Sequence, residues 1–309
     1  MGNQYTQYFS TDASAPSLTQ ADGSLLTVLD AILVNGYGTK PSAGWTKAFT
    51  NGTDISVYQA PSGVRHYMQV VDNQIASTYQ YADCIGFTSM SAYNAGTGQF
   101  GATGSGFPKG AYGPVSWIAF ADSRTLIFFC QGNGSISNSW CGCYFGEIYS
   151  VQTNDSFRSL VKAYTRTGGV ENLGAISASI ATPTPSASMP AGYTGVGSQV
   201  NVSATGDNAK SGGATVLKGI VPFPNPEEGG LYLSPVWIAD PTTSPTNNIR
   251  GRMRGFWHTL HPNTSINHLQ TFTGIGDLAG RSFIAIKPTG DVSASGTFMI
   301  EISATLETN

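Results

Sequence analysis

Two apolar runs separated by a short polar turn constrain the fold of this chain more than any other feature. WIAFA ends at Ala121 and TLIFFC begins at Thr125, with Asp122 and Ser123 in the turn between them. Two short apolar runs on either side of such a turn are typical of a β-hairpin. Neither run alternates with polar residues, so neither strand is suited to face water on either side. The sequence therefore predicts a hairpin at the centre of a sheet.

The composition favours many short strands over helices. Charged residues make up only 11% of the 309 residues, less than half the usual share, and there are 38 glycines. We therefore predict an all-β fold, mainly of antiparallel, sandwich-like domains, with one or two short helices. The net charge of −3 gives no electrostatic footprint for nucleic acid, and no apolar run is long enough to span a bilayer. We expect neither nucleic acid nor a membrane as a partner.

The strands are predicted from apolar and β-branched runs bounded by turn residues. In the first half they are Trp45 to Tyr58, Val64 to Val71, Ala82 to Ser89, Val115 to Ala121, Thr125 to Gln131 and Trp140 to Val151. In the second half they are Thr215 to Pro222, Leu231 to Ala239, Met253 to His261, Gln270 to Thr273, Ser282 to Ile286 and Thr297 to Thr305.

Two segments are predicted to be helical. The first is Ser24 to Val34, with Ser24 as its cap and Asn35-Gly36 as its left-handed stop. Its apolar stripe at helical spacing consists of Leu25, Leu29, Ile32 and Leu33. The second is short, with Asn154-Asp155 as its cap, and carries Phe157, Leu160, Val161 and Tyr164.

A change of composition divides the chain. Residues 174–215 are rich in Ala, Ser, Thr, Gly and Pro and have hardly an aromatic residue, so they cannot bury enough apolar area to order themselves alone. We predict an N-terminal, mainly β domain over residues 1–173 with a helix near 24–34. A connector over 174–215 and a C-terminal β domain over 216–309 complete the predicted organisation.

The segment from Gly229 to Pro262 contains the densest cationic cluster, Arg250, Arg252 and Arg254. At the period of two that governs strands, the three guanidiniums would lie on one face. Such a basic face suits acidic side chains of a neighbouring subunit, or phosphate. We take the following residues as a candidate subunit interface, with the two glutamates as its acidic members: Arg250, Arg252, Arg254, Trp257, Glu227 and Glu228.

Residues of catalytic or metal-binding type do not form a recognised motif. His258 and His261 would lie on opposite faces of an extended segment, and no carboxylate is close to them or to His268 in sequence. We interpret them as polar surface histidines. The acids Asp54, Asp72 and Asp83 are not paired by any hydrolase motif. We therefore predict no catalytic residue, no metal site and no cofactor, and hence no enzyme.

The four cysteines, Cys84, Cys130, Cys141 and Cys143, all lie in the first half. The Cys141-Gly-Cys143 spacing is too tight for a zinc knuckle, and no second pair follows. We interpret them as small buried hydrophobes of a chain made in a reducing cytosol.

Several longer phrases resemble a family of virion structural proteins of tailed bacteriophages and prophages. They are LLTVLDAILVNGYG, GWTKAFTNGTDISVYQAP from Gly44, PFPNPEEGGLYLSPVWIAD and IRGRMRGFWHTLHP, and the resemblance extends through the closing FIAIK and FMIEISAT. It implies a virion component made in the host cytoplasm, whose partners are copies of itself and other virion proteins. We expect a position in the neck or collar or beside the tail.

A receptor- or carbohydrate-binding module of a tail fibre or baseplate is the alternative function. Such a module would present exposed aromatic rings as stacking platforms, and the candidates are Trp45, Trp140 and Trp257. Aromatic residues of β-proteins are more often buried in the core, however, so the assembly function is preferred.

Overall fold

The structure is a computed structural model. It describes residues 5–75, 80–101, 103–110, 114–131, 140–165, 187–192, 198–199, 201–204, 222–227, 229–240, 248–261, 265–287 and 297–303. All the strand pairs in these ranges are antiparallel, which confirms the predicted all-β class. Among the same residues, no helix has the length and hydrophobicity needed to cross a membrane.

The elements follow in chain order. The first half contains β1 (Thr6–Phe9), α1 (Ser24–Leu29), the π-helix η1 (Asp30–Asn35), β2 (Thr46–Thr50), β3 (Ile55–Gln59), β4 (Tyr67–Ile75), β5 (Gln80–Phe87), β6 (Ser89–Ala92), β7 (Ala95–Thr97), β8 (Ser105–Gly110), β9 (Trp117–Ala121), β10 (Thr125–Gln131), β11 (Trp140–Ser150), β12 (Ser159–Lys162) and β13 (Tyr164–Thr165). The second half contains β14 (Ala187–Met189), β15 (Ser198–Gln199), β16 (Asn201–Ala204), β17 (Leu233–Asp240), β18 (Asn248–Thr259), β19 (Thr271–Thr273), the 3₁₀-helix η4 (Gly276–Leu278), β20 (Ser282–Ile286) and β21 (Phe298–Glu301).

Most predicted strands are confirmed, with shifted ends. The predicted strand Trp45 to Tyr58 is two strands, β2 and β3, because the Asn51 side chain turns the chain between them. Its Oδ1 accepts hydrogen bonds from the backbone N–H groups of Thr53, Asp54 and Ile55. Residues 215–221 of another predicted strand lie outside the described residues.

The first helix is confirmed, but its cap is not the predicted one. Gly23 is the N-cap residue, and the Ser24 hydroxyl accepts a hydrogen bond from Thr19 N. The carboxylate of Asp72 instead accepts a hydrogen bond from Leu25 N at 2.8 Å, and it forms a buried ion pair with Lys109 at 2.6 Å. Gly36, with φ 75°, follows the helix as predicted.

The second predicted helix is wrong. Asn154 has a left-handed φ of 56°, and Asp155 accepts a hydrogen bond from Phe157 N, so the segment is a tight turn. Leu160 and Val161 then belong to β12, which pairs with β11 and is buried along its whole length. Burial on both faces is what a strand inside a β-sheet requires, and it outweighs the weak helical spacing.

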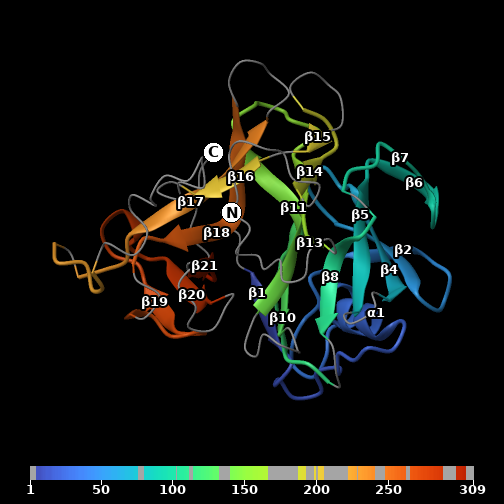
Figure 1. Ribbon diagram of the computed structural model, residues 1–309, viewed down its shortest axis with the longest axis horizontal. Helices are drawn as coiled ribbons and strands as arrows, with labels where there is room; N and C mark the ends of the chain where they lie inside the picture. Colours follow the sequence, from blue (N-terminus) through green and yellow to red (C-terminus); the bar gives the residue numbers. More distant parts are fainter. Residues whose placement is uncertain are drawn as a thin grey trace.

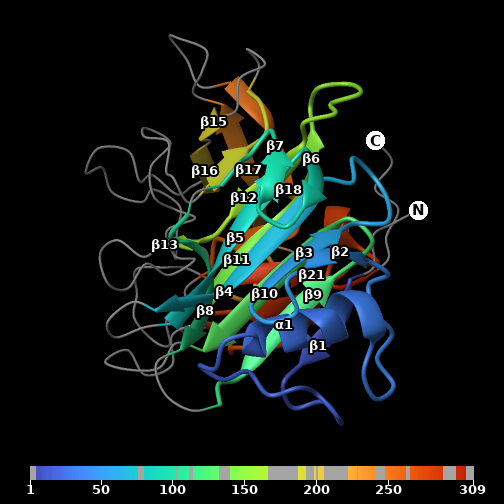
Figure 2. The same ribbon diagram turned by 90° about the vertical axis from the view of Figure 1, so that its right-hand side faces the viewer.

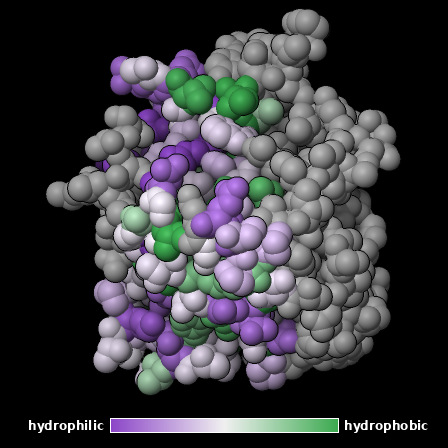
Figure 3. All heavy atoms as spheres, turned by 90° about the vertical axis from the view of Figure 1, so that its left-hand side faces the viewer, coloured by the Kyte–Doolittle hydropathy of each residue, from purple (hydrophilic) through white to green (hydrophobic). Residues whose placement is uncertain are grey.

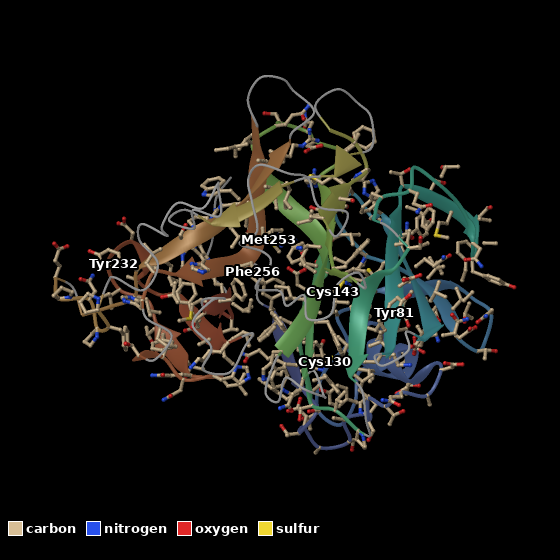
Figure 4. The ribbon with its side chains drawn as sticks, viewed as in Figure 1. Tyr81, Cys130, Cys143, Tyr232, Met253 and Phe256 are labelled. Carbon is tan, nitrogen blue, oxygen red and sulfur yellow. The ribbon has the colours of Figure 1, made fainter. Side chains whose placement is uncertain are left out.

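Two sheets enclose the core (Figures 1 and 2). The larger has 13 strands, ordered β1-β9-β10-β11-β18-β21-β20-β19 along its main path, and the smaller has six, ordered β13-β8-β5-β4-β3-β2. β10 and β11 occupy the middle of the molecule. In Figure 4, Cys130 and Cys143 on these strands lie between Tyr81 of the smaller sheet and Met253 and Phe256 of β18.

The central hairpin, β9 and β10, is confirmed and is buried on both faces. One face, with Trp117, Leu126 and Phe128, packs in a first apolar cluster with α1 and the smaller sheet. The other face, with Phe120 and Phe129, packs in a second apolar cluster with β17, β18, β20 and β21. The central strands thus have one face toward the smaller sheet and one face toward β17, β18, β20 and β21. Because these four strands belong to the same sheet as the central strands, the larger sheet is curled.

The predicted domain boundaries fall inside the larger sheet. β11, from the predicted N-terminal domain, pairs with β18, from the predicted C-terminal domain, at Ile148↔Met253, Tyr149↔Arg252 and Ser150↔Gly251. The described parts of the predicted connector contribute β14, which pairs with β12, and β16, which pairs with β17. The two predicted domains thus share one sheet and the second apolar cluster. Whether either folds without the other stays a prediction.

Candidate functional site

The arginine segment predicted as a basic face is the middle of β18, and it lies against the end of β11. Gly255, with φ 61°, follows the last of the three arginines and ends their alternation. The pairing with β17 shifts in register at this point. The three arginine side chains contact the end of β11 and the turns at Asp122 and Asp155.

Arg250 is buried in an ion pair with Asp155. Its Nη2 and Nε donate to the two carboxylate oxygens at 2.7 and 3.0 Å, so the pair is bidentate. Ser150 Oγ and Phe157 N also donate to this carboxylate. The side chains of both partners are 2% exposed, so the charges are removed from water and held by several hydrogen bonds.

Arg254 is buried in a second ion pair, with Asp122 of the central hairpin turn. Its Nη2 lies 3.0 Å from Asp122 Oδ2, and its Nη1 donates to Thr125 Oγ1. Burial lowers the pKa of Arg254, but the charge of Asp122 and the neighbouring tyrosines outweigh this, so the pKa is raised and the guanidinium stays charged. Tyr5 donates from its hydroxyl to the carbonyl of Arg254 at 2.9 Å, which attaches the start of the chain to β18.

Arg252, between these two, is half-buried and packs on aromatic rings. Its Cζ lies 4.9 Å from the centre of the Tyr149 ring and 5.7 Å from that of Trp257. Arg254 Cζ lies 5.5 Å from the same Tyr149 ring. Arg252 and Arg254 therefore share a face, as the strand period predicts.

The interface interpretation of these residues needs correction. Arg250 and Arg254 are each 2% exposed and pair with acids of their own chain, so they do not form an accessible basic face. Trp257 is 8% exposed and donates to Glu301, so it too is internal. Glu227 is exposed and accepts a hydrogen bond from the Tyr232 hydroxyl. Glu228 lies outside the described residues.

A polar pocket of about 610 Å³ opens beside this cluster. The end of β11, from Glu147 to Ser150, and the turn at 151–154 line one part of it, and Arg124, Arg158 and Arg254 line the rest. Glu147 is 4% exposed and is held by Arg158 Nε at 2.8 Å and by Val64 N at 2.5 Å. Arg124 Nη1 lies 3.9 Å from the same carboxylate, beyond hydrogen-bonding distance. Its side chain is 43% exposed.

The cluster contains most of the arginines of the chain. The chain has eight arginines, at positions 65, 124, 158, 166, 250, 252, 254 and 281. Five of them, at positions 124, 158, 250, 252 and 254, lie in this cluster or line its pocket. The acids among them are Asp122, Glu147 and Asp155, so the cluster has five positive and three negative charges. It is a cationic region on a chain whose net charge is −3.

The histidines considered for a metal site do not converge. His258 and His261 are each 1% exposed, so the prediction that they lie at the surface is wrong. His261 Nε2 accepts a hydrogen bond from Tyr232 N, whereas the His268 ring stacks on Trp140 with centroids 4.9 Å apart. In the described ranges, no group of three or more His, Cys, Asp or Glu side chains is placed to hold a metal ion.

The aromatic candidates for ligand stacking are mostly internal. Trp45 is 2% exposed and donates from Nε1 to the carbonyl of Asp122 at 2.7 Å. Trp140 is partly exposed, but its ring is covered on one side by His268. Together with buried Trp257, these positions correct the expectation of exposed stacking platforms.

The cysteines Cys84, Cys130 and Cys143 are buried, as predicted. Cys84 comes from the smaller sheet and Cys143 from β11, and burial, followed by a hydrogen bond with Cys143, raises the pKa of the Cys84 thiol. The side chain of Cys141 lies outside the described part of the structure.

Reasoning from sequence found the arginines of β18 but missed their partners. Asp122 was assigned only to a hairpin turn and Asp155 to a helix cap, although both are turn acids that can also accept charged donors. Arg124 and Arg158 each lie two or three residues after one of these acids. An arginine two or three residues after an acid in a turn is the sequence pattern that could have indicated these charged clusters. No protein-family model matches the chain, and no curated protein matches it.

Proposed function

We propose that the chain is a structural component of a tailed-bacteriophage virion that assembles as repeated copies, in the neck or collar or beside the tail. Its partners are then other copies of itself and other virion proteins, and it acts without a cofactor. The resemblance of its longer phrases to virion structural proteins supports this proposal. The structure adds one observation that suits assembly.

That observation is a group of exposed apolar side chains around the Arg250–Asp155 pair. Val151 is 61% exposed, Ile249 51% and Phe157 42%. Val151 N donates to the carbonyl of Arg250, Phe157 N donates to Asp155, and Ile249 precedes Arg250 in β18, so the backbone of each residue lies next to one member of the pair. We call them the apolar patch. Grouped, rigidly held apolar side chains are typical of surfaces that bind another protein.

On the face formed by β17, β19 and β20, hydrophobic residues lie in small groups among hydrophilic ones (Figure 3). Leu269 and Ile275 are large apolar side chains outside the apolar patch that are also exposed, at 36% and 37%. They provide a matched control for the apolar patch.

The test is incorporation into particles. A variant with Val151, Phe157 and Ile249 replaced by Ser should fold normally, because exposed apolar side chains add little to stability. It should be incorporated at less than about one tenth of the wild-type amount, since docking surfaces depend on a few apolar anchors. The measurement is the band intensity of the protein in purified virions, with Leu269→Ser/Ile275→Ser as the control. Equal incorporation of both variants would reject the apolar patch as an assembly surface.

The proposal includes no enzymatic activity. Glu147, the acid that lines the pocket, is engaged by Arg158 and Val64 N, and Asp122 and Asp155 are engaged by arginines. An acid held in this way is not poised to transfer protons. Loss of turbidity of bacterial cell walls on addition of the purified protein would overturn this part of the proposal.

Receptor or carbohydrate binding is the second candidate function, as part of a tail fibre or baseplate. The pocket beside the arginine cluster favours it, whereas the buried tryptophans do not. Adsorption of the purified protein to host cells separates this candidate from a purely structural one.

A further inference from the structure

The polar pocket has the size and the walls of a ligand-binding site. Its volume of about 610 Å³ is within the range of roughly 300 to 1,000 Å³ that is usual for small-molecule sites. Three arginines and one glutamate line it, an excess of two positive charges, and Asp122 beside Arg254 offsets one of them. A net positive charge on the walls favours an anionic ligand.

The two arginines at the mouth differ in how firmly they are held. Arg158 is fixed by Glu147 through Nε and by the carbonyl of Asp155 through Nη1. Arg124, in contrast, makes a long contact of 3.9 Å and is 43% exposed, so its guanidinium is able to turn toward a ligand. A planar carboxylate matches the paired N–H groups of a guanidinium. Arg124 is therefore the residue best placed to bind an incoming carboxylate.

The buried guanidinium of Arg254 in the wall of the pocket also favours an anion. Arg254 is 2% exposed, and within the described residues its Nε makes no hydrogen bond although Nη1 and Nη2 do. Its full positive charge is maintained by Asp122 and by the raised pKa described above. It is a fixed positive charge at the wall of the pocket, and it favours an anion there without having to move.

The rest of the mouth carries neutral hydrogen-bonding groups. Gln152, Thr153 and Asn154 are exposed on the turn that follows β11. The turn is held in place, because Val151 N donates to the carbonyl of Arg250 and Gln152 N donates to Ser150 Oγ. Amide and hydroxyl side chains on a fixed turn suit a ligand that carries several hydroxyl groups.

We propose that this pocket binds an acidic saccharide of the uronic acid type, with its carboxylate at Arg124 and its hydroxyls at the turn 151–154. A free phosphate would use the arginines but not the turn, and a neutral sugar would use the turn but not the arginines. The inference gives a ligand to the second candidate function. It does not depend on assembly, since it concerns the isolated chain, and Val151 is the one residue of the apolar patch that also lines the pocket.

Calorimetric titration of the purified full-length protein tests the inference. The probes are digalacturonate, inorganic phosphate and the neutral disaccharide lactose, each at millimolar concentrations. Digalacturonate should bind at least about tenfold more tightly than either control, because lactose lacks the carboxylate that binds Arg124 and phosphate lacks the sugar hydroxyls that bind the turn. Phosphate binding as tight as that of digalacturonate would overturn the saccharide assignment, and equal binding of lactose would overturn the carboxylate contact. No binding of any probe would overturn the site itself.

Two variants locate the binding. Arg124→Gln should weaken digalacturonate binding about tenfold, whereas Arg124→Lys, which keeps the charge, should recover part of the loss. Arg65→Gln is the control, since Arg65 is an exposed arginine outside the pocket. An equal loss in the Arg65 and Arg124 variants would show that binding is a general charge effect. These titrations are independent of particle incorporation, so failure of one proposal is distinguishable from failure of the other.

Discussion

The central strands are held in two different ways on their two sides. Toward the smaller sheet, β9, β10 and β11 pack in the first apolar cluster, where Phe128 stacks on Trp117 and meets Phe107 edge to face. Along the edge where β11 meets β18, two buried arginines and their acids hold the strands together. The first contact relies on apolar area alone, whereas the second adds directed, charge-assisted hydrogen bonds to the burial of the second apolar cluster.

The two kinds of contact differ in how many substitutions they accept. Apolar burial has no direction, so a core of suitable volume accepts many side chains. A buried ion pair has no such tolerance, because removing one partner leaves an uncompensated charge away from water. The junction of β11 with β18 should therefore depend more on residue identity than the apolar cluster does, although both are buried.

Truncation of the apolar cluster is expected to have the largest effect. Phe128 is fully buried in the middle of β10, so Phe128→Ala should lower the free energy of unfolding by roughly 3 to 5 kcal/mol. Chemical denaturation of wild type and variant measures the difference. Phe128→Leu, which keeps most of the volume, should cost less than half as much. An unchanged midpoint for the alanine variant would mean that this strand is not part of the core.

Breaking one ion pair at the junction is expected to cost somewhat less. Asp155→Asn keeps the shape but leaves Arg250 buried without its counter-charge, which should cost about 3 kcal/mol. The double variant Asp155→Leu/Arg250→Met should recover much of this loss, because two apolar side chains need no partner. Lys47→Ala removes the half-exposed Lys47–Asp30 pair and should cost about 0 to 1 kcal/mol. If Asp155→Asn costs no more than Lys47→Ala in denaturant titrations, the distinction between the two sides fails.

Mild acid should lower the free energy of unfolding by a smaller amount, through two histidines. Burial lowers the pKa of His66, which is hydrogen-bonded to Ser159, to about 4. Burial, followed by the charge of Lys287, also lowers that of His268 to about 4. In the unfolded chain both titrate near 6.5. Between pH 6.5 and 4 the unfolded state therefore binds more protons, and stability falls as the pH falls.

The measurement is the melting temperature at pH 7 and at pH 5. The drop between these two values should be smaller in His66→Gln and in His268→Gln than in wild type. The comparison uses the drop and not the melting temperature at one pH, because either substitution also changes packing. Equal drops in all three proteins would show that these histidines are protonated in the folded state at pH 5.

The sequence predicted what local patterns determine. The central hairpin and the first helix follow from the spacing of apolar residues within each segment, and both are confirmed. The second helix failed because Asp155, taken as a cap, binds Arg250, which is 95 residues further along. The cap of the first helix failed for the same reason, since it comes from Asp72, 47 residues away from Leu25. Partners at such distances leave no periodic pattern in the sequence.

The same reasoning explains how much of the candidate site was predictable. The alternation of arginines in β18 predicted that Arg252 and Arg254 share a face, and they do. Their burial depends on the curl of the larger sheet, which brings the turns at Asp122 and Asp155 beside β18. No property of the segment itself distinguishes an exposed basic face from one covered by acids of the same chain.

The junction of β11 with β18 also determines when this protein can finish folding during its synthesis. Ser150 pairs with Gly251, about 100 residues later, so the ribosome works for about 5 to 20 s between the two. During that interval β18, β20 and β21, which pack on the face of the central hairpin that belongs to the second apolar cluster, have not yet been made. Arg254 and Arg250, the ion-pair partners of Asp122 and Asp155, have also not been made. The nascent chain thus exposes its most apolar strands until β18 emerges, and aggregation during this delay competes with correct folding.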